Sequence, residues 1–209
     1  MLDLDIAFHN VKPKNYKGVY KMQNNSDLIL RTYNIIDETA NSDAMIEAIS
    51  GFLGFPFTLI ADGATVLTHY IPMLGKIREL NGKAPWTAES FGPIFKSLSS
   101  ELLFDILVDK VLGQIPIAGI YFNLICAKSL TWRVGMLCAM CSCLQNDVTD
   151  IETLKKTSIL IREIFPQRSI FKFAKPNYND FRKVMLSIMN NDASAFGSKI
   201  NKALEAFDI

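Results

Sequence analysis

Residues 111–144 read VLGQIPIAGIYFNLICAKSLTWRVGMLCAMCSCL, and this long apolar stretch decides the fold. Its uncharged part, Val111–Ala127, has 17 residues, and the two cations Lys128 and Arg133 follow it. A membrane-spanning helix needs about 20 apolar residues, whereas about 10–14 are typical of a buried core helix. The stretch falls between these cases. The embedded cations favour a long packed helix with polar contacts over a simple span.

A carboxylate has a similar setting earlier in the chain. Asp62 lies within an apolar run, where a charge is costly unless it is paired. We therefore predict structural polar contacts for Asp62, Lys128 and Arg133, with the two cations as candidate partners of the carboxylate.

The composition limits the class of protein. Among 209 residues, 49% are hydrophobic, yet 21% are charged, which is too many for a protein with several membrane spans. The net charge of +1 makes nucleic acid an unlikely partner. The N-terminus lacks the basic and apolar regions of a signal peptide, so we expect a cytoplasmic protein whose four cysteines are thiols.

The spacing of apolar residues predicts an all-α fold. We expect a helical bundle built on two helical hairpins that glycine and proline interrupt, with polar helical flanks. The predicted regions are an N-terminal arm and helix (1–42), a hydrophobic helical-hairpin domain (43–146) and a C-terminal helical region (147–209). The predicted hairpin-turn residues are Gly54, Pro56, Gly113, Pro116 and Gly119.

Individual elements follow from the same pattern. Residues 1–25 are polar and are predicted to be an arm, with helix beginning at Ser26, and residues 83–93 are predicted to be a connecting loop. Asn81-Gly82 is a typical helix end. Further helices are predicted at 94–112, at 116–144, from Thr149 or Asp150 to Phe165, at about 178–190 and at 192–207.

No catalytic, cofactor-binding or metal-binding residue is predicted. The glycines match neither of the two standard nucleotide-binding motifs. Cys138, Cys141 and Cys143 lie in a predicted helix rather than on zinc-binding loops, so buried thiols are the preferred interpretation over a metal site. Asp62 and His69 share a predicted helical face with Thr65, but a structural role is preferred to a catalytic one.

Aromatic and basic residues alternate over residues 167–183. Such interleaving suits an anionic surface, either nucleic acid or lipid headgroups, but ordinary core aromatics on a solvated element are the preferred interpretation. Trp132, with Tyr70 and Tyr121, could likewise belong to an interfacial aromatic belt or to the core.

The central region resembles a known family. Its motifs read GFPF (54–57), AD (61–62), YIPMLGKI (70–77), LNG (80–82), GQIPIAG (113–119), AK (127–128) and TWRVG (131–135). In order and spacing, over about residues 45–145, they are similar to the YcjF-like domain of unknown function. The resemblance implies a helical module that is often membrane-associated and often fused to, or encoded beside, a small GTPase domain. It transfers no catalytic residues, and it implies packing or hydrogen-bonding roles for Asp62 and Thr131.

Three functions are therefore expected. The first is a non-enzymatic helical adaptor or regulatory module at or near the cytoplasmic face of the inner membrane, working with a separate GTPase in trans because this chain lacks a GTPase motif. The second is a soluble subunit of a larger assembly that buries its apolar helices against partner proteins. The third is an effector or toxin that inserts conditionally into membranes. No cofactor is expected, and an oligomer is compatible with each.

Overall fold

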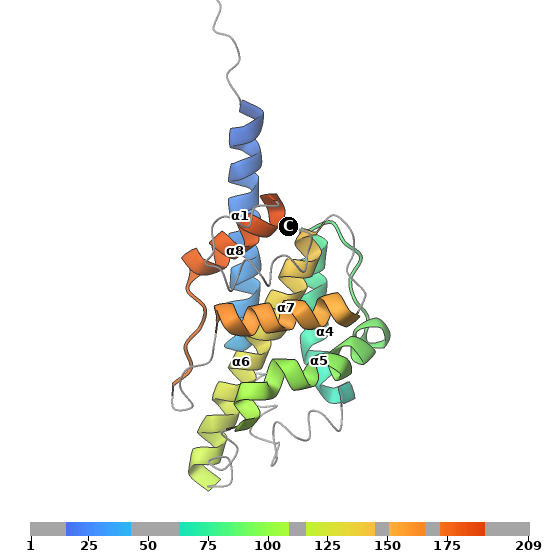
Figure 1. Cartoon of the computed structure of the whole chain (residues 1–209), viewed down its shortest axis with the longest axis vertical. Coiled ribbons are helices and arrows are strands. Elements are labelled where there is room, and N and C mark those ends of the chain that lie inside the picture. Colours follow the sequence, from blue (N-terminus) through green and yellow to red (C-terminus); the bar gives the residue numbers. More distant parts are fainter. Residues whose placement is uncertain (1–15, 43–62, 109–115, 145–150, 166–171, 191–209) are drawn as a thin grey trace, which may run out of the picture.

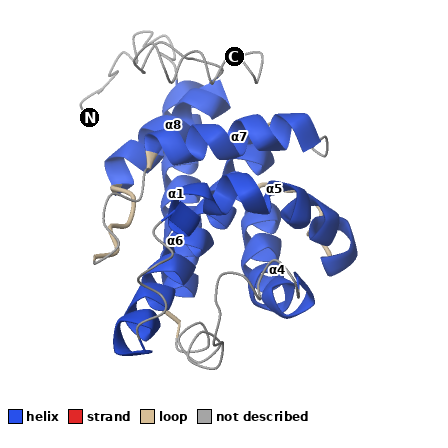
Figure 2. Cartoon of the chain, turned by 60° about the horizontal axis from the view of Figure 1, so that its bottom comes forward, coloured by secondary structure: helices blue, strands red, loops and turns tan. Residues whose placement is uncertain are grey.

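The computed structural model describes residues 16–42, 63–108, 116–144, 151–165 and 172–190. These residues form six helices and no strand (Figure 2). The predicted all-α fold is confirmed for this part of the chain.

The helix α6, Pro116–Cys143, is the centre of the bundle. Proline suits the first position of a helix, because its missing N–H has no partner there and its φ is already helical. The predicted helix at 116–144 is therefore confirmed almost to the residue. In the bundle α6 packs against each of the other five described helices.

Those five helices surround α6. In Figure 1, α1 and α6 run along the long axis of the molecule, and α7 lies across them. The predicted helices near 150–165 and 178–190 are confirmed. The five elements are α1 (Tyr16–Ala40), α4 (Gly63–Leu80), α5 (Ala88–Val108), α7 (Ile151–Ile164) and α8 (Tyr178–Asn190).

The burial of α6 bears directly on the membrane question. Among the described residues, Leu124–Cys143 is the single segment long and apolar enough to cross a bilayer, and 89% of its apolar window is buried inside the protein. Core helices of soluble proteins have the same length and composition. One continuous core includes Ile29 of α1, Leu154 of α7 and Phe181 of α8, so helices from all three predicted regions share it. The division into those regions stays a prediction.

Two helices begin earlier than the sequence predicts. Helix α1 starts at Tyr16 rather than Ser26, and Gly18 lies inside it. Helix α5 starts at Ala88 within the predicted loop 83–93, because Thr87 and Ser90 cap it reciprocally. The Thr87 Oγ1 accepts a hydrogen bond from the Ser90 backbone N–H (3.2 Å), and the Ser90 Oγ accepts one from the Thr87 N–H (2.9 Å).

The connection between α4 and α5 is held by a buried arginine. Helix α4 ends as predicted at Asn81-Gly82, where Gly82 has a φ of +67° that favours glycine. The guanidinium of Arg78, which is 1% exposed, lies 4.6 Å from the ring centre of Trp86. Its Nε donates a hydrogen bond to the Ala84 carbonyl. These contacts fix the turn that reverses the chain.

The predicted hairpin turns are only partly described. Gly54, Pro56 and Gly113 lie outside the described residues, so their role as turn residues stays a prediction. Pro116 begins α6, as a residue at the end of a turn should. Gly119 was predicted to belong to the turn and instead lies in the first turn of α6. The helix starts as soon as Pro116 supplies a helical φ.

Buried hydroxyl groups do not disturb this core, because the helices themselves satisfy them. Each donates to the carbonyl four residues earlier, a bond that serine and threonine form within helices. The bonds run from Thr32 to Leu28 (2.9 Å), Thr131 to Ala127 (2.8 Å), Ser142 to Cys138 (2.6 Å), Thr157 to Thr153 (2.7 Å) and Ser158 to Leu154 (2.9 Å). Thr131 has the hydrogen-bonding role that the family resemblance implies.

The closest approach of α1 to α6 occurs at Gly135. A Cβ built on this glycine would lie 2.7–3.0 Å from three side-chain atoms of Ile36, a spacing that real Cβ atoms essentially never show. The absence of a side chain at position 135 therefore sets the distance between these helices.

We predict that Gly135→Ala lowers the free energy of unfolding by about 1–3 kcal/mol, because the new methyl group overpacks the α1–α6 contact. Chemical denaturation measures the effect. The matched control is Gly75→Ala in α4, where the Cβ would meet only the Pro85 Cβ at 3.7 Å. There the change should be neutral or stabilising, by up to about 1 kcal/mol, because alanine favours a helix. Adding Ile36→Val should recover part of the loss at Gly135. An equal loss in both glycine variants would contradict the packing argument.

Candidate functional site

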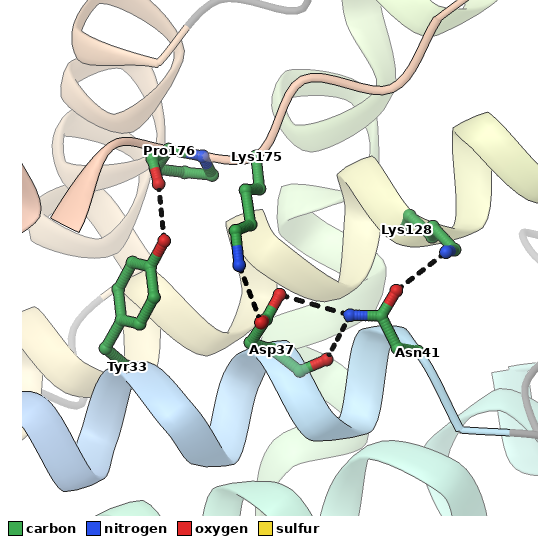
Figure 3. A network of polar contacts seen from close by, with 6 residues as sticks. All are labelled: Tyr33, Asp37, Asn41, Lys128, Lys175 and Pro176. Carbon is green, nitrogen blue, oxygen red and sulfur yellow. Dashed lines mark hydrogen bonds and ion pairs between the residues drawn. The ribbon is translucent and has the colours of Figure 1, made fainter.

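A short segment between α7 and α8 lies against both ends of the sequence order. We call residues 172–177 the strap. The Tyr33 hydroxyl of α1 donates a hydrogen bond to the Pro176 carbonyl of the strap at 2.8 Å, and this contact is buried (Figure 3). A residue near the N-terminus of the described chain thus holds a segment 143 positions later.

Side chains continue this contact as a polar network along α1 (Figure 3). The ammonium of Lys175 lies 2.7 Å from a carboxylate oxygen of Asp37. The amide nitrogen of Asn41 donates to the other oxygen of Asp37 at 3.1 Å, and its amide oxygen accepts from Lys128 Nζ at 2.7 Å. The network therefore connects the strap, α1 and α6.

The protonation states in the network are stable near neutral pH. Burial raises the pKa of the Tyr33 hydroxyl, although the nearby Lys175 partly offsets this. The hydrogen bond to Asp37 raises the pKa of the Lys175 ammonium. Tyr33 thus stays neutral and Lys175 stays charged, so the network suits holding the strap rather than transferring protons.

Aromatic rings pack beneath the network. The ring of Tyr33 lies 4.9 Å from Trp132 of α6, 5.3 Å from Tyr178 and 5.5 Å from Phe181, measured between ring centres. The tilted and edge-on arrangements are those that aromatic pairs prefer. The strap therefore rests on a rigid layer of rings.

A small cavity of about 20 Å³ lies between the strap, α6 and α7. This volume holds about one water-sized atom. It is lined by Ser129, Trp132, Arg133, Met136, Ile161, Phe165, Phe173, Ala174 and Pro176.

The indole of Trp132 is unusual among the residues around this cavity. The side chain is 2% exposed, and its Nε1–H has no hydrogen-bond partner within the described part of the chain. An indole nitrogen can only donate. A buried donor left without an acceptor costs about 1–3 kcal/mol, so such a group needs an explanation.

The structure places the two predicted cations in different contacts. Lys128 faces α1, where it binds Asn41. Arg133 is 4% exposed and faces α5, where its Nη1 donates to the Leu102 carbonyl at 2.6 Å. Asp62 lies outside the described residues, so its predicted pairing with either cation stays a prediction.

The other predicted groups fall on the structural side where they are described. Trp132 and Tyr70 are buried in the core. In the basic and aromatic segment, Phe181 is buried and Phe173 packs against the core, while Lys172 is exposed. The side chains of Thr65, His69 and Tyr121 are not described, so no catalytic set that includes them is tested here.

Sequence reasoning missed the α1 half of the network. Tyr33, Asp37 and Asn41 are spaced four residues apart, which places them on one helical face. That spacing could have marked a shared face. It gave no sign of the partner, because Lys175 is 138 residues away in the chain.

The cysteines are thiols in the described structure. Cys126, Cys138 and Cys141 are buried, Cys143 is half-buried, and all four are free. Within the described residues no group of three or more potential ligand side chains could hold a metal ion. Burial, with a smaller contribution from Cys138, raises the pKa of the Cys143 thiol to about 12.

With this geometry established, the chain can be compared with known proteins. No protein-family model matches the sequence, no curated protein matches it, and no solved structure matches the fold. The resemblance to the YcjF-like domain therefore stays a prediction.

We predict that Tyr33→Phe destabilises the protein by about 1–3 kcal/mol, because the buried Pro176 carbonyl loses its donor. Lys175→Gln should cost at most about 1 kcal/mol, since the ion pair with Asp37 is partly exposed. Denaturation at low salt and at about 1 M salt separates the two effects, because salt screens an exposed pair. Only the Lys175→Gln effect should disappear at high salt, and a salt-sensitive Tyr33→Phe effect would contradict this assignment.

We predict that the native thiols resist a thiol reagent at about pH 8, because a pKa near 12 lowers the thiolate fraction of Cys143 roughly a thousandfold relative to an ordinary cysteine. In guanidinium chloride all four cysteines should react. The unfolded chain loses the Cys143 proton from about pH 9, whereas the folded chain keeps it until about pH 12, so the free energy of unfolding should fall as pH rises across this window. Rapid reaction of Cys143 in the native protein would refute the assignment, and Cys143→Ser identifies its share.

Proposed function

We propose that the protein is a non-enzymatic helical adaptor that binds a protein partner. The observation that carries this proposal is the burial of α6. Its apolar surface is used inside the bundle, where 89% of the apolar window is buried, and its cations Lys128 and Arg133 bind α1 and α5. A helix committed in this way supports a folded interaction module rather than a membrane span.

The outer face of α7 supports a place for the partner. Three large hydrophobic side chains are exposed in the described residues, and two of them, Ile151 (44%) and Ile159 (40%), lie on this helix. With Lys155 and Arg162 they lie within an arc of about 80°, at ~100° per residue. We call these four residues the α7 face. Its apolar centre with basic neighbours suits an acidic, partly apolar partner surface.

The other two expected functions need different uses of the same elements. An inserting effector would have to withdraw α6 from the core, which would expose buried groups such as Arg133 and Trp132 to lipid at high cost. The membrane-face version of the adaptor would use the α7 face against anionic headgroups. A GTPase working in trans is a candidate partner through the family resemblance alone.

We predict that a photo-crosslinking amino acid at position 151 or 159 captures the same protein in the native cell. Positions Asn34 of α1 and Asn179 of α8 are the matched controls, because both are exposed and lie away from the α7 face. One discrete adduct at 151 and 159, absent at 34 and 179, is the expected result. Equal labelling at all four positions, or none at 151 and 159, would contradict the proposal.

Charge substitution tests the affinity for the captured partner. We expect Ile159→Asp to weaken binding at least about tenfold, which corresponds to about 1.4 kcal/mol, while Asn34→Asp leaves it unchanged. Flotation with anionic vesicles provides the membrane comparison. Vesicle binding that Ile159→Asp abolishes, without any protein adduct, would replace the protein partner by a lipid surface.

A further inference from the structure

The cavity under the strap offers donors without an acceptor. Trp132 lines it with a buried indole whose N–H is unpaired within the described residues. Arg133 lines it as well, and a guanidinium carries donors only. Ser129 supplies a hydroxyl that can donate or accept. The missing complement is therefore a group that accepts hydrogen bonds.

The charges around the strap favour an anion as that acceptor. Arg133 lies in the cavity wall, and Lys128 Nζ lies 5.9 Å from the ring centre of Phe173, another wall residue. Lys175 precedes the wall residue Pro176 and is held by Asp37. Cations near a cavity of low polarity raise the preference for a negative ligand over a neutral one.

The size of the cavity limits the ligand further. About 20 Å³ of accessible space admits one water-sized atom, so a single oxygen can enter while the rest of the ligand stays at the mouth. A flat carboxylate can present one oxygen edge-on. A tetrahedral phosphate or sulfate is bulkier around the same oxygen.

We propose that this cavity is a binding site for a carboxylate group, with the Trp132 indole N–H donating to the oxygen that enters beneath the strap and Arg133 supplying the compensating charge. The site stands independently of the adaptor function proposed above. The carboxylate belongs either to a free small acid or to an acidic side chain of a bound protein.

The tryptophan content of the chain allows a direct test. The protein has only two tryptophans, so ¹⁵N labelling gives two indole resonances, and Trp86, stacked on Phe91, serves as an internal control. Sodium formate and sodium acetate are titrated against sodium chloride at equal ionic strength. A saturable shift of the Trp132 indole with either carboxylate, with Trp86 unmoved, is the expected result.

Two variants separate binding from a structural role. Trp132→Phe removes the donor and keeps a large ring, so the rise in melting temperature that acetate causes relative to chloride should disappear. In chloride alone its stability should change little, because the lost N–H had no partner. Phe173→Ala enlarges the wall, and it should allow butyrate to reproduce the shift that only formate and acetate give in the wild type.

The source of the carboxylate is distinguished by a second ligand. Triglutamate with blocked ends carries only side-chain carboxylates. Saturation at lower concentration than acetate assigns the site to a protein-borne carboxylate, whereas response to acetate alone assigns it to a free acid.

The opposing result is an ordered water only. In that case the Trp132 resonance would show a cross-peak to water and no response to any carboxylate, and the proposal would be wrong. Equal effects of chloride and acetate would overturn it as well.

Discussion

The close contact between α1 and α6 at Gly135 is the constraint on which the rest of the structure depends. The side chain of Ile36 occupies the space that any Cβ at position 135 would need. This contact fixes the register of the two helices. One turn beyond Ile36, Asn41 then meets Lys128, and one turn before it, Tyr33 lies against Trp132. A wider spacing would separate each of these pairs.

The strap inherits its position from that register. Its hydrogen bond and ion pair both end on α1, at Tyr33 and Asp37. Because the strap also forms one wall of the cavity, the spacing of α1 and α6 decides the size of the carboxylate site. The buried hydrogen bond of Tyr33 contributes more to this arrangement than the exposed ion pair of Lys175, since a buried acceptor left unpaired keeps its full desolvation cost.

Local sequence patterns predicted most helices because local physics forms them. Pro116 begins α6 and Asn81-Gly82 ends α4, since both depend on backbone conformations a residue or two away. The errors arose where two local signals competed. At residues 83–93 the prolines suggested a loop, whereas the Thr87–Ser90 capping pair begins a helix within it. At the N-terminus a polar composition hid α1, whose apolar stripe is clear only from about Leu28 onward.

By itself the sequence determined an all-α protein centred on residues 116–144, because helix periodicity and breakers act over a few residues. It also showed that Lys128 and Arg133 need polar partners. Only the tertiary structure decided those partners, Asn41 and the Leu102 carbonyl, and only it left the Trp132 N–H facing no acceptor among the described residues. The physical reason is distance along the chain. Contacts between residues about a hundred positions apart depend on how helices pack, and packing leaves no periodic trace in the order of amino acids.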